Sequence, residues 1–144
     1  MTVYRVVIEH EDDVYMASTL GKRVAEDYGL NKSQQTKLVV SIMELTRNIV
    51  FYANKGELFI KPLPPYGIEI TAVDQGPGIP NLDQILDSNT FSSKKGLGLG
   101  LSGVRRLMDE FEITSTVNLG TKVRAVKWLN EGQVKHIDYF THRA

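Results

Sequence analysis

A carboxylate and a carboxamide stand four residues apart, at Glu44 and Asn48, in a segment whose apolar residues recur at helical spacing. Residues four apart on a helix are stacked neighbours on its surface, and at roughly 100° per residue this pair lies beside the apolar stripe. There Asn48 can offer a neutral oxygen to Mg²⁺, which takes few protein ligands beside substrate phosphates, while Glu44 stays free to act. The competing interpretation is two solvated residues on a helix surface.

A second candidate is the loop that begins at Asp74. Asp74 closes an apolar strand and enters the sequence Gly76-Pro77-Gly78, where two glycines let the main chain approach a planar ligand. A carboxylate at the base of such a loop can accept a hydrogen bond from an exocyclic amine. A plain strand-ending turn with a capping Asp is the alternative.

The third candidate is the glycine-rich segment 96–100, which opens onto a helix. Free N–H groups and the positive end of the helix dipole favour phosphate there. Residues 98–103 also match the dinucleotide pattern G-x-G-x-x-G, but no buried strand precedes them and no acidic residue follows about 20 residues later. No G-x-x-x-x-G-K-[ST] occurs either, so we exclude the Rossmann and P-loop classes.

The helices that must position these residues follow from periodicity and capping signals. Residues 2–9 predict a strand, and the acidic run 11–13 supplies an N-cap and favourable charge for a helix that ends at Gly29. A long helix begins at Asn31 or Ser33. Its apolar stripe is Leu38, Ile42, Leu45, Ile49 and Tyr52.

The remaining segments predict strands and short helices. Two strand-like segments, 56–60 and 67–73, flank a proline-rich loop at 62–65 that cannot continue a ladder, which favours an edge hairpin. The further elements expected are a short helix within 81–89, a helix from Leu99 or Leu101 to Phe111, and strands 112–117 and 122–129 that meet at Asn118-Leu119-Gly120. This order predicts an α+β fold, a two-layer sandwich with helices on one face of a mainly antiparallel mixed sheet.

Composition limits the function classes. The 144 residues fit one domain, and the absence of cysteine removes disulfides and thiolate zinc sites. Basic and acidic residues balance at 17 each, so we expect neither nucleic acid nor a membrane as a partner. No stretch approaches the ~20 apolar residues of a spanning helix and no signal peptide is recognisable, so a cytoplasmic protein is expected.

In combination, the Glu44/Asn48 helix, the Asp74 loop, the glycine-rich segment and Gly120-Thr121 resemble the N, G1, G2 and terminal motifs of the GHKL ATP-binding superfamily, the Bergerat fold. Five stretches are similar to the RsbT-like serine/threonine kinases of bacterial stressosomes, namely residues 44–49, 74–80, 96–101, 103–111 and 127–129. The resemblance covers roughly residues 3–130. It therefore implies a kinase domain at 1–130 and a C-terminal extension at 131–144, which is expected to add a helix or strand or to bind a partner.

The resemblance also implies roles for single residues, with ATP and Mg²⁺ as cofactors. Glu44 would be the general base, Asn48 the Mg²⁺ ligand, and Asp74 the reader of the adenine amino group with support from Thr121. The nucleotide contacts that it implies are Asn48, Asp74, Gly76, Gly78, Ile79, Lys95, Gly96, Gly98, Gly100 and Thr121. Many sensor-kinase relatives carry a basic residue three after the Asn, where this chain has Phe51. Lys94 or Lys95 is the candidate for the missing charge, and two solvated loop lysines are the alternative.

The activity implied by the resemblance is transfer of the γ-phosphate of ATP to a hydroxyl on a STAS-domain scaffold or antagonist protein (RsbS/RsbR-like). A PP2C-type phosphatase (RsbU-like) would be the second partner, activated by partner switching in a bacterial stress pathway. Two alternatives stay open: a nucleotide-gated binding switch with little kinase activity, and an anti-sigma factor kinase with the same ATP site.

Overall fold

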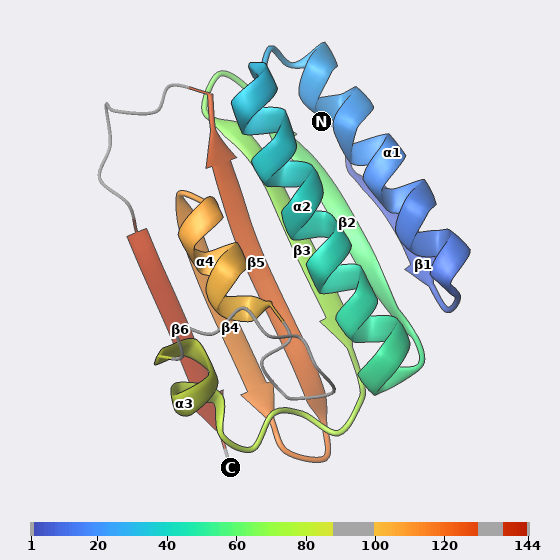
Figure 1. Cartoon of the computed structure of the whole chain (residues 1–144), viewed down its shortest axis with the longest axis vertical. Helices are drawn as coiled ribbons and strands as arrows, with labels where there is room; N and C mark the ends of the chain where they lie inside the picture. The colour runs from blue at the N-terminus through green and yellow to red at the C-terminus, as the bar shows by residue number, and fades with distance from the viewer. Residues whose placement is uncertain (1, 88–99, 130–136, 144) are drawn as a thin grey trace.

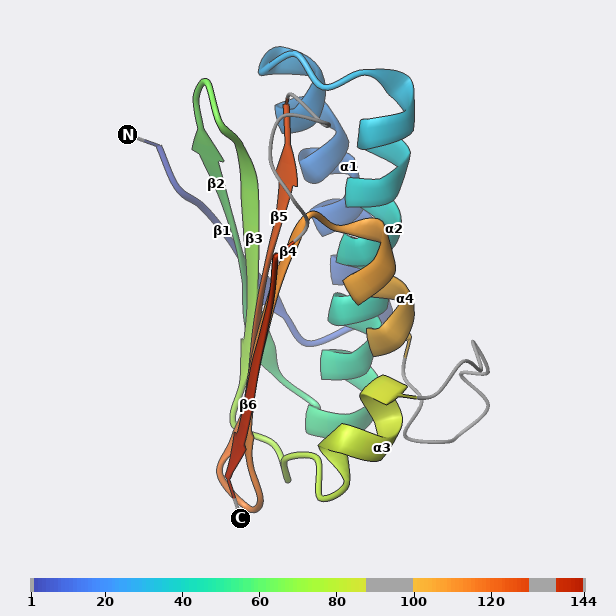
Figure 2. The same ribbon diagram turned by 90° about the vertical axis from the view of Figure 1, so that its left-hand side faces the viewer.

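The computed structural model describes residues 2–87, 100–129 and 137–143, the last as backbone. Among these residues, four helices cover one face of a six-stranded sheet, and none of them lies on the other face (Figures 1 and 2). The helices are α1 (Glu11–Asp27), α2 (Lys32–Asn48), α3 (Leu82–Asp87) and α4 (Leu101–Leu107), and a π-helical turn, η1 (Ile49–Ala53), continues α2. The strands are β1 (Tyr4–Ile8), β2 (Gly56–Leu63), β3 (Gly67–Asp74), β4 (Glu110–Thr116), β5 (Gly120–Trp128) and β6 (Ile137–Arg143).

The sheet has the strand order β1-β2-β3-β5-β4-β6. All neighbouring strands are antiparallel except β4 and β6, which pair in parallel with Glu110 opposite Ile137. The predicted fold class, an α+β sandwich with helices on one face of a mainly antiparallel mixed sheet, is therefore confirmed.

Side chains reaching back to the backbone fix where the two long helices begin. At α1, the Asp13 carboxylate accepts hydrogen bonds from the amides of Glu9 and His10 at 2.8 and 2.9 Å, so His10 holds the N-cap position and the acidic run acts from inside the helix. At α2, Asn31 and Gln34 exchange side-chain-to-amide bonds of 2.7 and 2.8 Å. Of the two predicted starts, Asn31 is thus the N-cap.

The core lies between the helices and the sheet and is built on the predicted stripe of α2. Its residues Leu38, Ile42, Leu45 and Ile49 are each at most 2% exposed. They pack with fully buried strand residues such as Ile60 in the same cluster. Beyond Asn48 the helix widens into η1, which ends at Ala53 and is followed by the C-cap residue Asn54 with a φ of 69°. This wider turn brings Tyr52 and Ala53 to the site described below.

The predicted edge hairpin is wrong in two respects. The β2–β3 hairpin lies inside the sheet, because β1 pairs with β2 and β5 pairs with β3. Pro62, predicted to lie in a loop, pairs with Ile68 in the ladder. A proline is tolerated there because β1 pairs with β2 only as far as Ile60, so Pro62 faces no strand on that side.

The helix predicted to run to Phe111 ends at Leu107 instead. Met108 is already extended, with φ −97° and ψ 157°, and Phe111 belongs to β4. Contacts with β5 explain the difference: the Asp109 amide donates to the Val126 carbonyl at 2.9 Å, and the Trp128 amide donates to the Asp109 carboxylate at 2.8 Å. Tertiary pairing therefore overrides local helical periodicity here.

Candidate functional site

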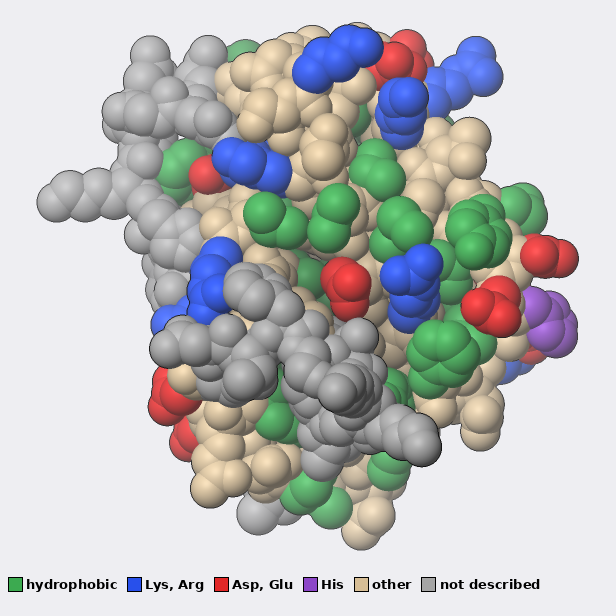
Figure 3. Space-filling view, in the orientation of Figure 1, with side chains coloured by type: hydrophobic (Ala, Val, Ile, Leu, Met, Phe, Trp, Pro, Cys, Tyr) green, Lys and Arg blue, Asp and Glu red, His purple; other side chains and the backbone are tan. Residues whose placement is uncertain are grey.

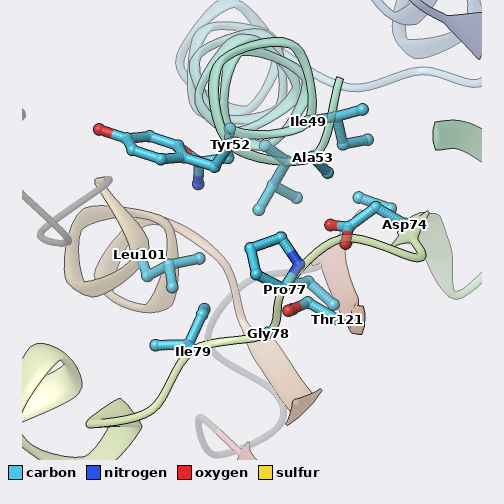
Figure 4. Close-up of a pocket in the computed structure, with 13 residues that line it drawn as sticks. Ile49, Tyr52, Ala53, Asp74, Pro77, Gly78, Ile79, Leu101 and Thr121 are labelled. Atoms are coloured by element: carbon cyan, nitrogen blue, oxygen red, sulfur yellow. The ribbon is translucent and has the colours of Figure 1, made fainter. Parts of the chain in front are cut away.

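A pocket lies where the end of α2 and η1 faces the loop after β3, strand β5 and the start of α4 (Figure 4). Asp74 and Thr121 stand at one side of it, and Tyr52, Leu101 and Ile79 at the other. Its lining is Leu45, Asn48, Ile49, Tyr52, Ala53, Ala72, Asp74, Pro77, Gly78, Ile79, Leu101, Thr121 and Val123. A mostly apolar pocket with a few convergent polar groups suits a flat organic ligand held by its edge.

The polar side of the pocket is set by the sheet register. Asp74 and Thr121 are Cα partners at the ends of β3 and β5, so their side chains emerge next to each other. The Gly76 amide donates to the Asp74 carboxylate at 2.9 Å. Burial raises the pKa of this carboxyl, and hydrogen bonds from the backbone at Gly76 and Thr121 oppose that rise. Asp74 is thus a partly desolvated acceptor aimed at the ligand space.

The loop after Asp74 is packed tightly against its surroundings. A Cβ on Gly76 would lie 2.6 Å from the Cβ of Ala53, and a Cβ on Gly78, whose φ is +76°, would lie 2.4 Å from the Thr116 carbonyl oxygen. The Asn118 amide also donates to the Pro77 carbonyl at 2.7 Å. The loop can therefore follow this path only with glycine at both positions.

Glu44 lies outside the pocket lining, one turn along α2 from Asn48, which does line it. A Cβ on Gly100 would lie 2.3 Å from Glu44 Oε2, so the carboxylate rests against the residue that precedes α4. Gly100 adopts a φ of +70°. The structure thus places Glu44 against Gly100, the residue next to Leu101 of the pocket lining.

The predicted phosphate-binding segment is described only in part. Gly96, Gly98, Lys94 and Lys95 lie outside the described residues, and of this motif the structure places Gly100 and Leu101. Of the other predicted contacts, Asn48, Asp74, Gly78, Ile79 and Thr121 come together around the pocket, and Gly76 and Glu44 adjoin it.

The apolar walls of the pocket and one buried hydroxyl, that of Ser115, were not predicted from the sequence. Leu45 and Ile49, which the sequence predicts as part of the core stripe, belong to the core and also line the pocket, because the pocket lies next to the core. Ser115 accepts a hydrogen bond from the Ile79 amide at 2.8 Å and lies 2.9 Å from the Thr121 hydroxyl. The pairing of Ser115 with Thr121 across the hairpin was the signal that could have identified it.

The donor set fits a magnesium ion that is held mainly by phosphates. Within residues 2–87 and 100–129, no group of three or more His, Cys, Asp or Glu side chains is placed to hold a metal ion. Asn48 offers one amide oxygen at the pocket. Mg²⁺ commonly keeps several waters and takes only one or two protein ligands beside substrate phosphates, so a single Asn is compatible with it.

Two comparisons with known proteins give matches over most of the chain. A family model described as a histidine kinase-like ATPase domain matches residues 10–127. The chain is also 42% identical over 127 residues to the serine/threonine-protein kinase RsbT of Bacillus subtilis (strain 168). That alignment covers 86% of this chain and 95% of the relative.

Proposed function

The chain belongs to the histidine kinase-like ATPase domain family, and we propose that it is a serine/threonine protein kinase that uses ATP with Mg²⁺. One observation carries this proposal: a pocket lined by a partly buried carboxylate, Asp74, has a second carboxylate, Glu44, beside it against Gly100. The first suits recognition of a base and the second suits proton abstraction. The name of the 42% identical relative, a serine/threonine-protein kinase, supports a protein hydroxyl as the acceptor.

In this proposal the base of ATP enters between η1 and the loop after β3. The ionised Asp74 accepts a hydrogen bond from the adenine amino group, and Ala53, Ile79 and Leu101 contact the ring. Asn48 is the protein ligand of Mg²⁺, which when bound neutralises charge on the phosphates. The glycine-rich segment from Gly96 to Gly100 would cover the triphosphate, with Lys94 or Lys95 as its cation.

Glu44 is proposed to act on the acceptor hydroxyl. Its carboxylate takes the proton from a serine or threonine hydroxyl of the partner protein while that oxygen bonds to the γ-phosphorus. The bond from the γ-phosphorus to the bridging oxygen breaks, and ADP leaves with the electron pair. Positioning and charge stabilisation supply most of the rate enhancement in phosphoryl transfer, so few catalytic side chains are needed.

We infer that the partners are those of an RsbT-like partner switch: a STAS-domain scaffold or antagonist as substrate, and a PP2C-type phosphatase as the protein activated. Exposed apolar side chains on the helix layer support a protein partner. Tyr15, Met16, Val40 and Phe51 are 57, 64, 37 and 59% exposed. Charges of both signs are scattered among apolar side chains on this face, without a broad basic field (Figure 3).

We propose that residues 1–130 form the kinase domain and that 131–144 form an extension, whose strand β6 pairs with the edge of β4. Among the described residues, no helix combines the length and apolar character needed to cross a membrane.

Replacing Glu44 by Gln tests the kinase against the nucleotide-gated switch. We expect phosphotransfer from radiolabelled Mg-ATP to a STAS-domain protein to fall by about 10²–10⁴-fold, because the amide cannot accept the proton. ATP affinity by calorimetry should stay within a few fold. Glu112→Gln, on the uncovered face of β4, is the control and should leave both unchanged.

Equal phosphotransfer by Glu44→Gln and wild type would remove Glu44 from its role. ATP binding without any labelled protein would favour the switch. Labelling of an anti-sigma antagonist, together with capture of a sigma factor in the same pull-down, would favour the anti-sigma kinase.

A further inference from the structure

Ser115 is a fully buried hydroxyl directly behind the polar side of the pocket. It lies in β4 opposite Thr121, is 0% exposed, and has no contact with the ligand space in the pocket lining. Its Oγ accepts the Ile79 amide hydrogen at 2.8 Å and lies 2.9 Å from Thr121 Oγ1. Ser115 therefore joins the loop that lines one side of the pocket, through Ile79, to the Thr121 hydroxyl that lines the other side.

The remaining hydrogen-bonding capacity of Ser115 fixes the direction of its bond with Thr121. A serine hydroxyl has one hydrogen to donate and two lone pairs, and the Ile79 amide occupies one lone pair. If Thr121 donated to Ser115, the Ser115 hydrogen would be left with the Gly120 carbonyl at 3.5 Å, well beyond the usual O–H···O range. If Ser115 donates to Thr121 instead, its hydrogen has a partner at 2.9 Å. The second arrangement satisfies the buried hydroxyl.

Thr121 then keeps its own hydrogen for the pocket that it lines. The site presents a hydrogen-bond acceptor, the Asp74 carboxylate, beside a donor, the Thr121 hydroxyl, because the two residues are register partners. A purine with an amino group at C6 and an unprotonated N1 presents the complementary pair, a donor beside an acceptor. A 6-oxopurine such as hypoxanthine presents the reverse, a carbonyl oxygen beside N1–H.

We propose that Ser115 is a positioning residue that fixes Thr121 as a donor toward N1 of the base, directly or through one water, and so selects 6-aminopurine nucleotides over 6-oxopurine nucleotides. This inference rests on the proposed function, since it takes the pocket to hold the base of a nucleoside triphosphate. Asp74 supplies discrimination at C6, and Ser115 supplies it at N1 through Thr121.

Calorimetry with three nucleotides tests the inference: ATP, inosine triphosphate, and 1-deaza-ATP, in which a C–H replaces N1. The variants are Ser115→Ala and the control Ser41→Ala. Ser41 is also 0% exposed, but its hydroxyl has no hydrogen-bond partner among the described residues. Removing it should leave nucleotide selectivity unchanged.

Wild type should bind 1-deaza-ATP about three- to tenfold more weakly than ATP, the size of one neutral hydrogen bond. In Ser115→Ala the preference for ATP over inosine triphosphate should fall by about three- to tenfold, because the Thr121 hydroxyl can then turn to accept from N1–H. The preference for ATP over 1-deaza-ATP should fall with it. A merely structural role would weaken all three nucleotides equally.

Unchanged nucleotide ratios in Ser115→Ala, with ATP still bound, would overturn the inference. Equal affinity of wild type for ATP and 1-deaza-ATP would overturn it as well, even if the variant failed to fold. A wild-type protein that binds none of the three nucleotides would instead refute the proposed function on which the inference rests.

Discussion

Replacing Gly100 by Ala should separate backbone strain from displacement of the proposed base. Gly100 adopts a φ of +70°, and a Cβ there would meet Glu44 Oε2 at 2.3 Å, Cδ at 2.8 Å and Cγ at 3.2 Å. The new methyl group therefore strains the backbone and pushes on the one carboxylate that we propose takes the proton.

The two effects have different sizes. An L-residue in the left-handed region costs roughly 1–2 kcal/mol, which corresponds to a loss of about 2–8 °C in Tm for a chain of this length. Ordinary van der Waals contact begins at 3.4 Å, so the Glu44 carboxylate must move by the difference from 2.3 Å, about 1 Å. A misplacement of about 1 Å can lower a reaction rate about 10²-fold.

Gly29→Ala is the matched control. Gly29 has a φ of +90°, and the nearest neighbour of its added Cβ is Leu129 Cδ2 at 3.9 Å, so this variant has the strain without the collision. We expect both variants to lose similar stability in thermal unfolding. Only Gly100→Ala should lose about 10²-fold in phosphotransfer from radiolabelled ATP, measured well below either Tm.

If Gly100→Ala and Gly29→Ala transfer phosphate equally well while both lose stability, then the contact between Gly100 and Glu44 has no bearing on the reaction. If Gly29→Ala loses phosphotransfer as severely as Gly100→Ala, strain alone accounts for the effect.

Two further predictions concern ionised groups. Asp74→Asn should weaken ATP binding by about 10–100-fold in calorimetry, since an Asn whose oxygen accepts from the Gly76 amide turns its NH2 donor toward the adenine amine. Without nucleotide, the same variant should be more stable than wild type, because burial raises the pKa of the Asp74 carboxyl and ionising it costs the folded wild-type protein free energy. The difference in stability should appear as the pH rises from the ordinary pKa of an aspartate to the raised pKa, and it should persist above that. A variant less stable than wild type at pH 7 would contradict this. Glu110→Gln should lower the free energy of unfolding by about 1–3 kcal/mol at pH 7, because the carboxylate accepts hydrogen bonds from Tyr66 and, at 2.7 Å, from Trp128 Nε1. Burial alone would raise the pKa of Glu110, but these hydrogen bonds and Arg124 hold it below its usual value. The stabilisation of the folded state by the Glu110 carboxylate is therefore present above the ordinary pKa of a glutamate and is lost as the pH falls through the lowered pKa. In denaturant unfolding, the difference in stability between wild type and Glu110→Gln should be smaller at pH 3 than at pH 7.

Local features of the chain were readable from the sequence because their causes are local. The period of α2 put Glu44 and Asn48 beside an apolar stripe, and the stripe is buried as expected. The turn at 118–120 was readable because it needs unusual backbone angles: Asn118 has a φ of 69° and Gly120 one of 137°. The identity of the site also came from the sequence, through motifs whose order and spacing match a known family.

Long-range pairing decided the rest. The sequence could not place the β2–β3 hairpin in the middle of the sheet, because strand order depends on β1 and β5, which lie far away in the chain. Phe111 became a strand residue because β5 offers hydrogen bonds that a helix there would forgo. Ser115 gained its importance only when the hairpin set it behind Thr121 and the loop brought Ile79 to it. Hydrogen bonds between distant segments have no periodic signature in the chain, so only the folded structure could reveal them.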